Sequence, residues 1–169
     1  MEKVLDKGYE VLYLTENVDE FALQMISTYS EKTFANVCSE SADMTDKEEE
    51  KEVKKANTDN KDLLAFMKEA LGDKIDSVKF TASLVDHPAC ISNEGMLSAN
   101  MEKTLNQMPG AEEKVQAQLV LEINKNHNIA EKLKTLYNED KDKLTKYSKI
   151  LYNNVKFWNV NVDIHQIHS

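Results

Sequence analysis

The stretch DLLAFMKEALGDKIDSVKFTAS, residues 62–83, contains two patterns from which much of the fold can be predicted. Its first half repeats apolar side chains at helical spacing, and Asp62 precedes them as a candidate helix cap. Gly72 then suits the left-handed backbone position that often ends a helix. The second half, DSVKFTAS, is a short β-favouring run. The stretch therefore predicts a helix followed by a strand.

Further runs after this stretch extend the same arrangement. PACIS (88–92) is a second strand candidate, and VQAQLVLEIN (115–124) becomes continuously apolar, as a buried strand does. NKNHNIAEKLKTLYN (124–138) predicts a helix with Asn126 or Asn128 as its cap, and DKLTKYSKILYN (142–153) predicts another. We therefore expect a C-terminal domain, residues 62–153, with a small three-stranded sheet and helices.

The N-terminal part, residues 1–44, predicts a strand, a helix and a second strand. YEVLYL (9–14) is β-favouring, Asn17 is a candidate cap, and KTFANVCS (32–39) is the second β-favouring run. Between them, apolar residues recur at helical spacing: Val18, Phe21, Ala22, Met25, Ile26 and Tyr29. This order indicates a βαβ-type segment with parallel pairing, so the predicted fold class is α+β.

Two other segments interrupt these patterns. Residues 45–61 are almost wholly charged or polar, which indicates a charged linker or a solvated helix with Glu–Lys pairs. An acidic partner-binding tract is the alternative, but interleaved lysines dilute its charge. Residues 154–169 alternate β-branched and polar side chains and do not continue the preceding helical period. We treat them as a divergent tail without an assigned structure.

Charge and composition exclude several functions. The net charge of −9 argues against binding to nucleic acid or to an anionic membrane surface. No apolar run reaches the roughly 18 residues that a membrane helix needs. The N-terminus lacks the apolar block of a signal peptide, and neither Cys38 nor Cys90 belongs to a CxxC pair. A cytoplasmic protein with reduced thiols is therefore expected.

No catalytic or metal-binding motif stands out. The chain contains four glycines and no GxG, so a glycine-rich phosphate loop is not expected. His165 and His168 have metal-compatible spacing, but no Cys or convincing carboxylate set accompanies them, so a solvated tail is favoured. A small enzyme using His87 and Cys90 is an alternative that lacks an orienting third group.

GMLSANMEKTLNQM, residues 95–108, contains three of the seven methionines. On a helix, a narrow apolar stripe is formed by Leu97, Met101, Leu105 and Met108. Most apolar stripes are core packing, and that reading stays open. A narrow stripe of unbranched, adaptable side chains also suits binding to dissimilar partners.

Four segments together resemble the heat-shock protein 90 chaperone family, in particular its bacterial members. They are KGYEVLYLTENVDEFALQ (7–24), LLAFMKEALGDKIDSVKFTASLVDHPACI (63–91), NMEKTLNQM (100–108) and LEINKNHNIAEKL (121–133). The resemblance covers residues 3–153. It implies a C-terminal fragment of a stress-response chaperone, without the ATPase domain that binds ATP and Mg²⁺ in full-length relatives. No enzyme activity and no cofactor are therefore expected in this chain.

The resemblance also implies two binding surfaces. Clients, which are unfolded or partly folded proteins, would contact Phe21 and the stripe of Leu97, Met101, Leu105 and Met108. A homodimer would form through the last helices, with Leu144, Tyr147, Ile150 and Leu151 on the contact face. The family's final dimer helix has no counterpart here, which puts the usual dimer in doubt. The alternative function is a non-catalytic interaction domain whose methionine stripe is buried as core.

Overall fold

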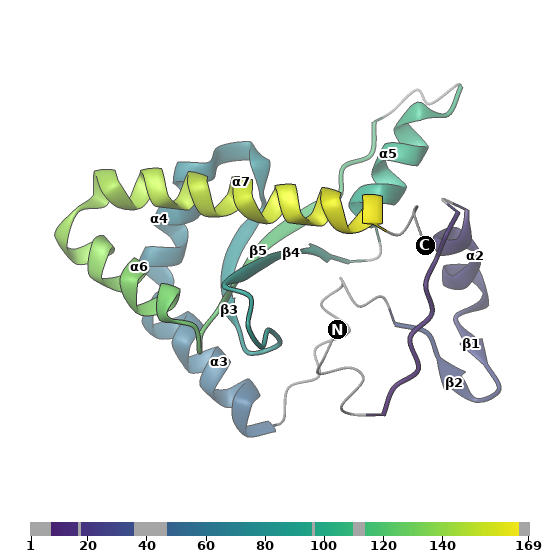
Figure 1. Cartoon of the computed structure of the whole chain (residues 1–169), viewed down its shortest axis with the longest axis horizontal. Coiled ribbons are helices and arrows are strands. Elements are labelled where there is room, and N and C mark those ends of the chain that lie inside the picture. The colour runs from purple at the N-terminus through teal and green to yellow at the C-terminus, as the bar shows by residue number, and fades with distance from the viewer. Residues whose placement is uncertain (1–7, 17, 36–46, 96, 110–113, 166–169) are drawn as a thin grey trace. The chain divides into compact units, whose positions relative to one another are not determined.

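The computed structural model describes residues 8–16, 18–35, 47–95, 97–109 and 114–165, with side chains described as far as Phe157 (Figure 1). The predictions for Asn17, Cys38 and His168 lie outside these residues, and the His165 side chain is not described. The chain divides into two compact units. Unit 1 comprises Met1–Asp43 and Asn93–Gln118, and unit 2 comprises Met44–Ser92 and Leu119–Ser169. Helices accompany separate small sheets, so the predicted class, α+β, is confirmed.

The three strands predicted for the C-terminal part are present and form one sheet. They are β3 (Ser77–Thr81), β4 (Ala89–Glu94) and β5 (Gln118–Asn124), in the spatial order β3-β5-β4. β3 and β5 are parallel, with Val78 opposite Leu121 and Phe80 opposite Ile123. All five residues from Val120 to Asn124 are buried. The continuous apolar run therefore marks the central strand, as expected for a strand covered on both faces.

Helices α4 (Lys61–Leu71), α6 (Asn128–Glu139) and α7 (Lys141–His165) complete the core of unit 2. α4 packs on β3 and α7, and α6 packs on α7 (Figure 1). The most buried large side chains of this core include Met67, Phe80, Leu121, Ile123, Leu133 and Leu144. The apolar face of α4 is therefore part of this core, as its helical period predicted.

The ends of these helices agree only partly with the prediction. Gly72 follows α4 with φ of 64°, in the left-handed region, and begins the short 3-10 helix η2 (Gly72–Lys74). The predicted cap Asp62 is wrong, because Asn60 occupies that position without a side-chain cap bond. At α6 the cap is His127 rather than Asn126 or Asn128. Its ring nitrogen Nδ1 accepts a hydrogen bond from the Ile129 N–H at 3.1 Å.

The charged segment after residue 45 forms a helix, α3 (Lys47–Asp59), which packs along β3. The Asn57 amide makes two hydrogen bonds to Phe80: its Nδ2 donates to the carbonyl at 3.0 Å, and its Oδ1 accepts from the N–H at 2.8 Å. Lys125 also binds the Glu52 carboxylate at 2.7 Å. Because β3 is an edge strand, Asn57 satisfies backbone groups that would otherwise stay open for pairing.

Residues 154–165 continue the preceding helix, so the prediction that the tail breaks its helical period is wrong for these residues. α7 runs without a break from Lys141 to His165. Ser148, Leu151, Tyr152 and Val155 are all buried, so the face that begins in the preceding segment continues into the tail. Within the described residues, no helix combines the length and the apolar character that crossing a bilayer requires.

Unit 1 contains α2 (Asp19–Ile26), the hairpin of β1 (Thr28–Tyr29) and β2 (Lys32–Thr33), and α5 (Ala99–Gln107). The predicted βαβ segment is wrong, because residues 9–14 form no strand and β1 pairs with β2 antiparallel. Ser30 and Glu31 have positive φ at the hairpin turn, as tight hairpins require. A strand is defined by its backbone pairing, and residues 9–14 form no ladder with any described strand, although Glu10 contacts Lys32 of β2.

Candidate functional site

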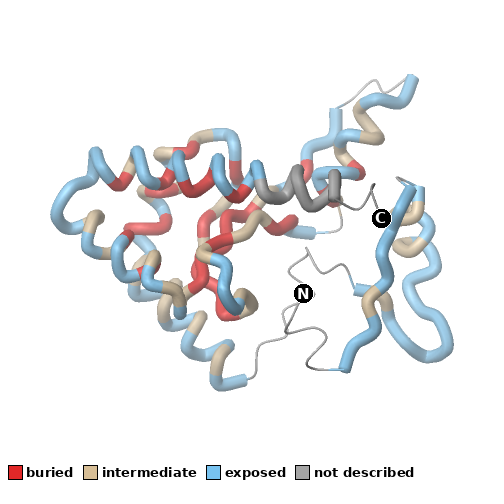
Figure 2. The backbone as a smooth tube through the Cα atoms, in the orientation of Figure 1, coloured by how far each residue is buried: buried red, intermediate tan, exposed pale blue. Residues whose placement is uncertain are grey.

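The two units differ in how they treat apolar side chains. Buried residues gather in unit 2, whereas the described residues of unit 1 are mostly exposed or half-buried (Figure 2). The large apolar side chains exposed in unit 1 are Tyr9, Leu12, Tyr13, Leu14, Val18, Met25, Ile26, Tyr29, Met108 and Val115. Met25 reaches 88% exposure. Since large exposed apolar areas usually mark interaction sites, unit 1 is the candidate binding surface.

Within unit 1, α2 and α5 are joined by polar contacts. The Ser98 hydroxyl accepts the Met101 N–H at 3.1 Å, as an N-cap, and donates to the Glu20 carboxylate at 2.7 Å. One turn further along α2, the Gln24 amide donates to the Met101 sulfur at 3.2 Å. Glu20 and Gln24 are four residues apart and so lie on the face of α2 that meets α5.

This contact divides the predicted methionine stripe. Met101 is buried, with 6% of its surface exposed, whereas Leu97 and Leu105 are half-buried and Met108 is 51% exposed. α5 spans nine residues, so Leu97 precedes its cap and Met108 follows its last turn. Met101 is therefore a packing residue of unit 1. The accessible part of the stripe lies at its two ends and at Leu105.

The polar face of α5 binds the backbone of residues 115–117, which follow the helix in sequence. Asn106 makes two hydrogen bonds to Val115: its Nδ2 donates to the carbonyl at 2.9 Å, and its Oδ1 accepts from the N–H at 3.0 Å. One turn earlier, the Glu102 carboxylate accepts the Ala117 N–H at 2.8 Å. These bonds keep residues 115–117 on the side of α5 that carries Glu102 and Asn106, away from the stripe.

α2 presents a second accessible surface that the resemblance did not nominate. Phe21 is half-buried, but Val18, Met25 and Ile26 are exposed. On a helix these three positions lie opposite Glu20 and Gln24, and therefore opposite the face that meets α5. Their helical spacing is visible in the sequence, where it predicts the helix of the βαβ-type segment but not which residues are exposed.

The predicted dimer residues on α7 fall into two groups. Leu144 and Leu151 belong to the core of unit 2, so they are not available to a second chain in this fold. Tyr147 and Ile150 are exposed, and Phe157 is exposed on the same side of the helix. Positions 147, 150 and 157 recur at helical spacing, which makes a narrow outward stripe.

The sequence of this chain matches known proteins along most of its length. The family model described as Hsp90 protein matches residues 1–158. This chain belongs to the Hsp90 family. Chaperone protein HtpG of Clostridium perfringens is 49% identical to it over 152 residues. The HtpG proteins of Clostridium acetobutylicum and Bacillus velezensis are 47% and 43% identical over the same length.

Each of these alignments covers 90% of this Hsp90-family chain and 24% of the relative. The chain therefore spans about a quarter of the length of the curated relatives it matches. The sequence resemblance to bacterial members of the family is confirmed.

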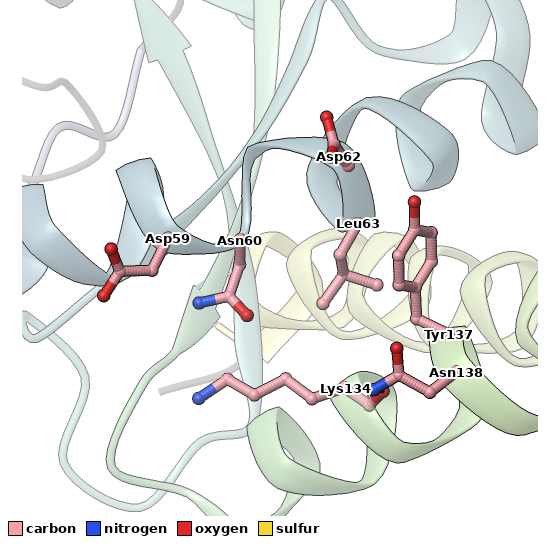
Figure 3. A pocket seen from close by; sticks show the side chains of 7 residues that line it. All are labelled: Asp59, Asn60, Asp62, Leu63, Lys134, Tyr137 and Asn138. Atoms are coloured by element: carbon pink, nitrogen blue, oxygen red, sulfur yellow. Dashed lines mark hydrogen bonds between the residues drawn. The ribbon is translucent and has the colours of Figure 1, made fainter.

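The Hsp90-family chain also has a hollow of about 220 Å³ between the α3–α4 junction and α6 (Figure 3). Its lining is mostly polar: Asp59, Asn60, Asp62, Leu63, Lys134, Tyr137 and Asn138. Small-molecule sites usually measure about 300–1,000 Å³ and have predominantly apolar walls. The hollow is smaller and more polar than that, so it is not the candidate site.

The residues considered for chemistry lie elsewhere in unit 2. The His87 carbonyl accepts a hydrogen bond from the Asn124 amide at 3.1 Å, so this turn is tied to the end of β5. Cys90 on β4 is half-buried and forms no disulfide with another described residue. Within the ranges that the structure describes, no group of three or more His, Cys, Asp or Glu residues could hold a metal ion.

Proposed function

We propose that this chain binds non-native segments of client proteins through the exposed apolar side chains of unit 1. The observation that carries the proposal is the concentration of exposed apolar side chains in unit 1, in a chain whose similar proteins are named chaperones. Burying such side chains stabilises a complex by ~25 cal/mol per Å², without requiring a particular client sequence. Phe21, Leu97, Leu105 and Met108 are the proposed contacts, joined by Val18, Met25 and Ile26.

Met101 has a different role in this proposal. Its side chain packs against Gln24 and holds α5 on α2, so it positions the contacts rather than touching the client. A carboxylate at position 101 would carry a desolvation cost inside unit 1 itself. Loss of binding in Met101→Glu would therefore report damage to unit 1 and would not identify a contact.

Met108→Glu tests the proposal at an exposed position. The probe is reduced, carboxymethylated α-lactalbumin, a permanently unfolded protein, and its binding is measured by fluorescence anisotropy. We expect affinity to fall about three- to tenfold. Val85→Glu is the matched control, since Val85 has 49% exposure in unit 2, close to the 51% of Met108. Equal affinities for both variants would contradict the proposal.

We also propose that the chain self-associates through Tyr147, Ile150 and Phe157 on α7. Analytical ultracentrifugation would then show a dimer that Ile150→Glu shifts toward monomer, with Val85→Glu unchanged. A wild-type monomer at about 100 μM would refute this part.

The proposed role uses no catalytic residue of this chain. The ATP and Mg²⁺ implied by the family are assigned to parts of the relatives that it does not span, and the expected location is the cytoplasm.

The burial of Met101 is the observation that favours the alternative function, a non-catalytic interaction domain whose methionine stripe is buried as core. Such a domain would recognise one folded partner and ignore unfolded protein. If wild-type protein fails to bind carboxymethylated α-lactalbumin, this alternative replaces the chaperone proposal.

A further inference from the structure

The negative charge of the chain is concentrated in the unit that exposes apolar side chains. Unit 1 contains 13 acidic and five basic residues, a net charge of −8. Unit 2 contains 17 acidic and 16 basic residues, a net charge of −1, and together they account for the chain's −9. The charged helix α3 belongs to the nearly neutral unit, so the conspicuous charged run in the sequence is not the source of the imbalance.

Several of the carboxylates in unit 1 are available to a partner. Glu16, Glu31 and Glu94 are exposed, and no ion pair or side-chain hydrogen bond involves their carboxylates within the described residues. Lys32, one of the few basic residues of unit 1, already pairs with Glu10 at 3.2 Å. By contrast, Lys54, Lys79, Lys125 and Lys134 of unit 2 each pair with a carboxylate of the same unit.

Glu16 and Glu31 flank the α2 region of the chain, where Val18, Met25, Ile26 and Tyr29 are exposed. Glu94 precedes the stripe that begins at Leu97. Exposed carboxylates therefore border the exposed apolar residues in both segments of unit 1. A partner that buries the apolar groups must bring its own flanking groups near these carboxylates, and like charges placed there would be repelled.

We infer that unit 1 selects client segments in which apolar residues are interleaved with lysine or arginine. This inference rests on the proposed function and names its substrate class. Apolar contact supplies most of the affinity, and the surplus of carboxylates supplies the discrimination between cationic and anionic segments. Because the carboxylates are exposed, salt screens the discrimination, and the Debye length is only about 8 Å at 0.15 M.

Three peptides with one apolar core test the inference on the full chain. The core, of leucine, phenylalanine and valine, is flanked by four lysines, four serines or four glutamates, and fluorescence anisotropy gives each Kd. At 25 mM salt we expect the lysine peptide to bind about tenfold more tightly than the glutamate peptide, with the serine peptide between them. At 0.5 M salt the three values should converge to within about twofold.

A pair of charge-reversal variants ties the preference to unit 1. Glu16→Lys combined with Glu31→Lys changes the net charge of unit 1 from −8 to −4 and should remove most of the preference for the lysine peptide. Glu69→Lys combined with Glu139→Lys makes the same change of charge at exposed positions of unit 2. It should leave the preference within twofold of the wild type.

The outcomes separate this inference from the proposed function. Binding of all three peptides with equal Kd at low salt would overturn the inference and leave client binding intact. If none of the three peptides binds, both the inference and the proposed function are overturned. A preference that falls equally in the two double variants would also overturn the inference, because net charge alone would then explain it.

Discussion

Helix α4 of unit 2 and helix α2 of unit 1 have similar apolar patterns, but only α4 buries its apolar face. In α4 the apolar face is buried, with Leu63, Met67 and Leu71 in the core. In α2 no residue is buried, and Met25 and Ile26 are exposed. α4 packs against β3 and α7, whereas the described part of unit 1 offers α2 a nine-residue helix and a hairpin of two-residue strands. An amphipathic pattern therefore predicts a helix, but burial depends on the elements available to cover it.

The strongest test of this difference is truncation of a side chain in each unit. Phe80→Ala leaves a cavity in the core of unit 2, and we expect the free energy of unfolding to fall by about 3–5 kcal/mol. Met25→Ala in unit 1 should change it by less than about 0.5 kcal/mol, since Met25 is exposed. Urea denaturation followed by circular dichroism measures both. A similar loss in the two variants would show that α2 is buried in solution.

The edge of the sheet gives the next largest effect. Asn57→Ala removes both hydrogen bonds to the Phe80 backbone, and we expect a loss of about 1–2 kcal/mol in the free energy of unfolding. Asn153→Ala, at an exposed position of α7, is the matched control and should be neutral. If Asn57→Ala is also neutral, α3 does not close this edge, and unit 2 is stable without it.

The corresponding asparagine of unit 1 should have a smaller and more local effect. Asn106→Ala removes two hydrogen bonds between side chain and backbone at an exposed site. A loss of about 1 kcal/mol would make the Val115 amide exchange roughly five- to tenfold faster. Hydrogen exchange measured by NMR tests this, with the Leu121 amide of unit 2 as the internal reference. Unchanged exchange at Val115 would show that the Asn106 hydrogen bonds do not protect this amide.

The smallest effect concerns pH and the contact between α3 and Lys125. The Lys125 ammonium, through a hydrogen bond and its charge, holds the pKa of Glu52 below its usual 4.5. Because the pKa is lowered in the folded protein, the contact stabilises the fold above pH 4.5. That contribution is lost as pH falls through the lower folded value. Glu52→Gln should therefore be less stable than the wild type at pH 7, and the difference should vanish in acid.

Denaturation curves at several pH values measure the difference between wild type and Glu52→Gln. Glu139→Gln provides the control at an exposed position with no such partner. Since Glu52 is exposed, 0.5 M salt should reduce the difference as well. A difference that persists in acid would mean that position 52 acts through helix propensity and not through the ion pair.

Most of unit 2 was predictable from the sequence because its signals are local and its packing agrees with them. The three strands were expected, and the continuous run in β5 indicated a strand covered on both faces. The caps were less predictable, since Asp62, Asn126 and Asn128 all have suitable side chains, yet Asn60 and His127 occupy the cap positions. The sequence also did not predict that α3 covers the edge of the sheet. This role depends on hydrogen bonds between Asn57 and Phe80, which is 23 residues away in sequence.

The candidate site was harder to predict because exposure is not a property of one segment. The stripe from Leu97 to Met108 has a uniform pattern, yet only Met101 is buried, and it contacts Gln24, which is 77 residues away in sequence. The same limit applies to α7, where Leu144 and Tyr147 belong to one apolar segment and only Tyr147 is exposed.

By itself, the sequence determined the α+β class, the strands of the larger sheet, the family and the acidic surplus, because composition and short-range periodicity encode them. Only the tertiary structure decided that residues 9–14 form no strand and that α7 continues to His165. It also decided that Met101 is buried while Met108 remains exposed. These outcomes depend on which distant elements are present to pair with a backbone or to cover a side chain, and local pattern does not contain that information.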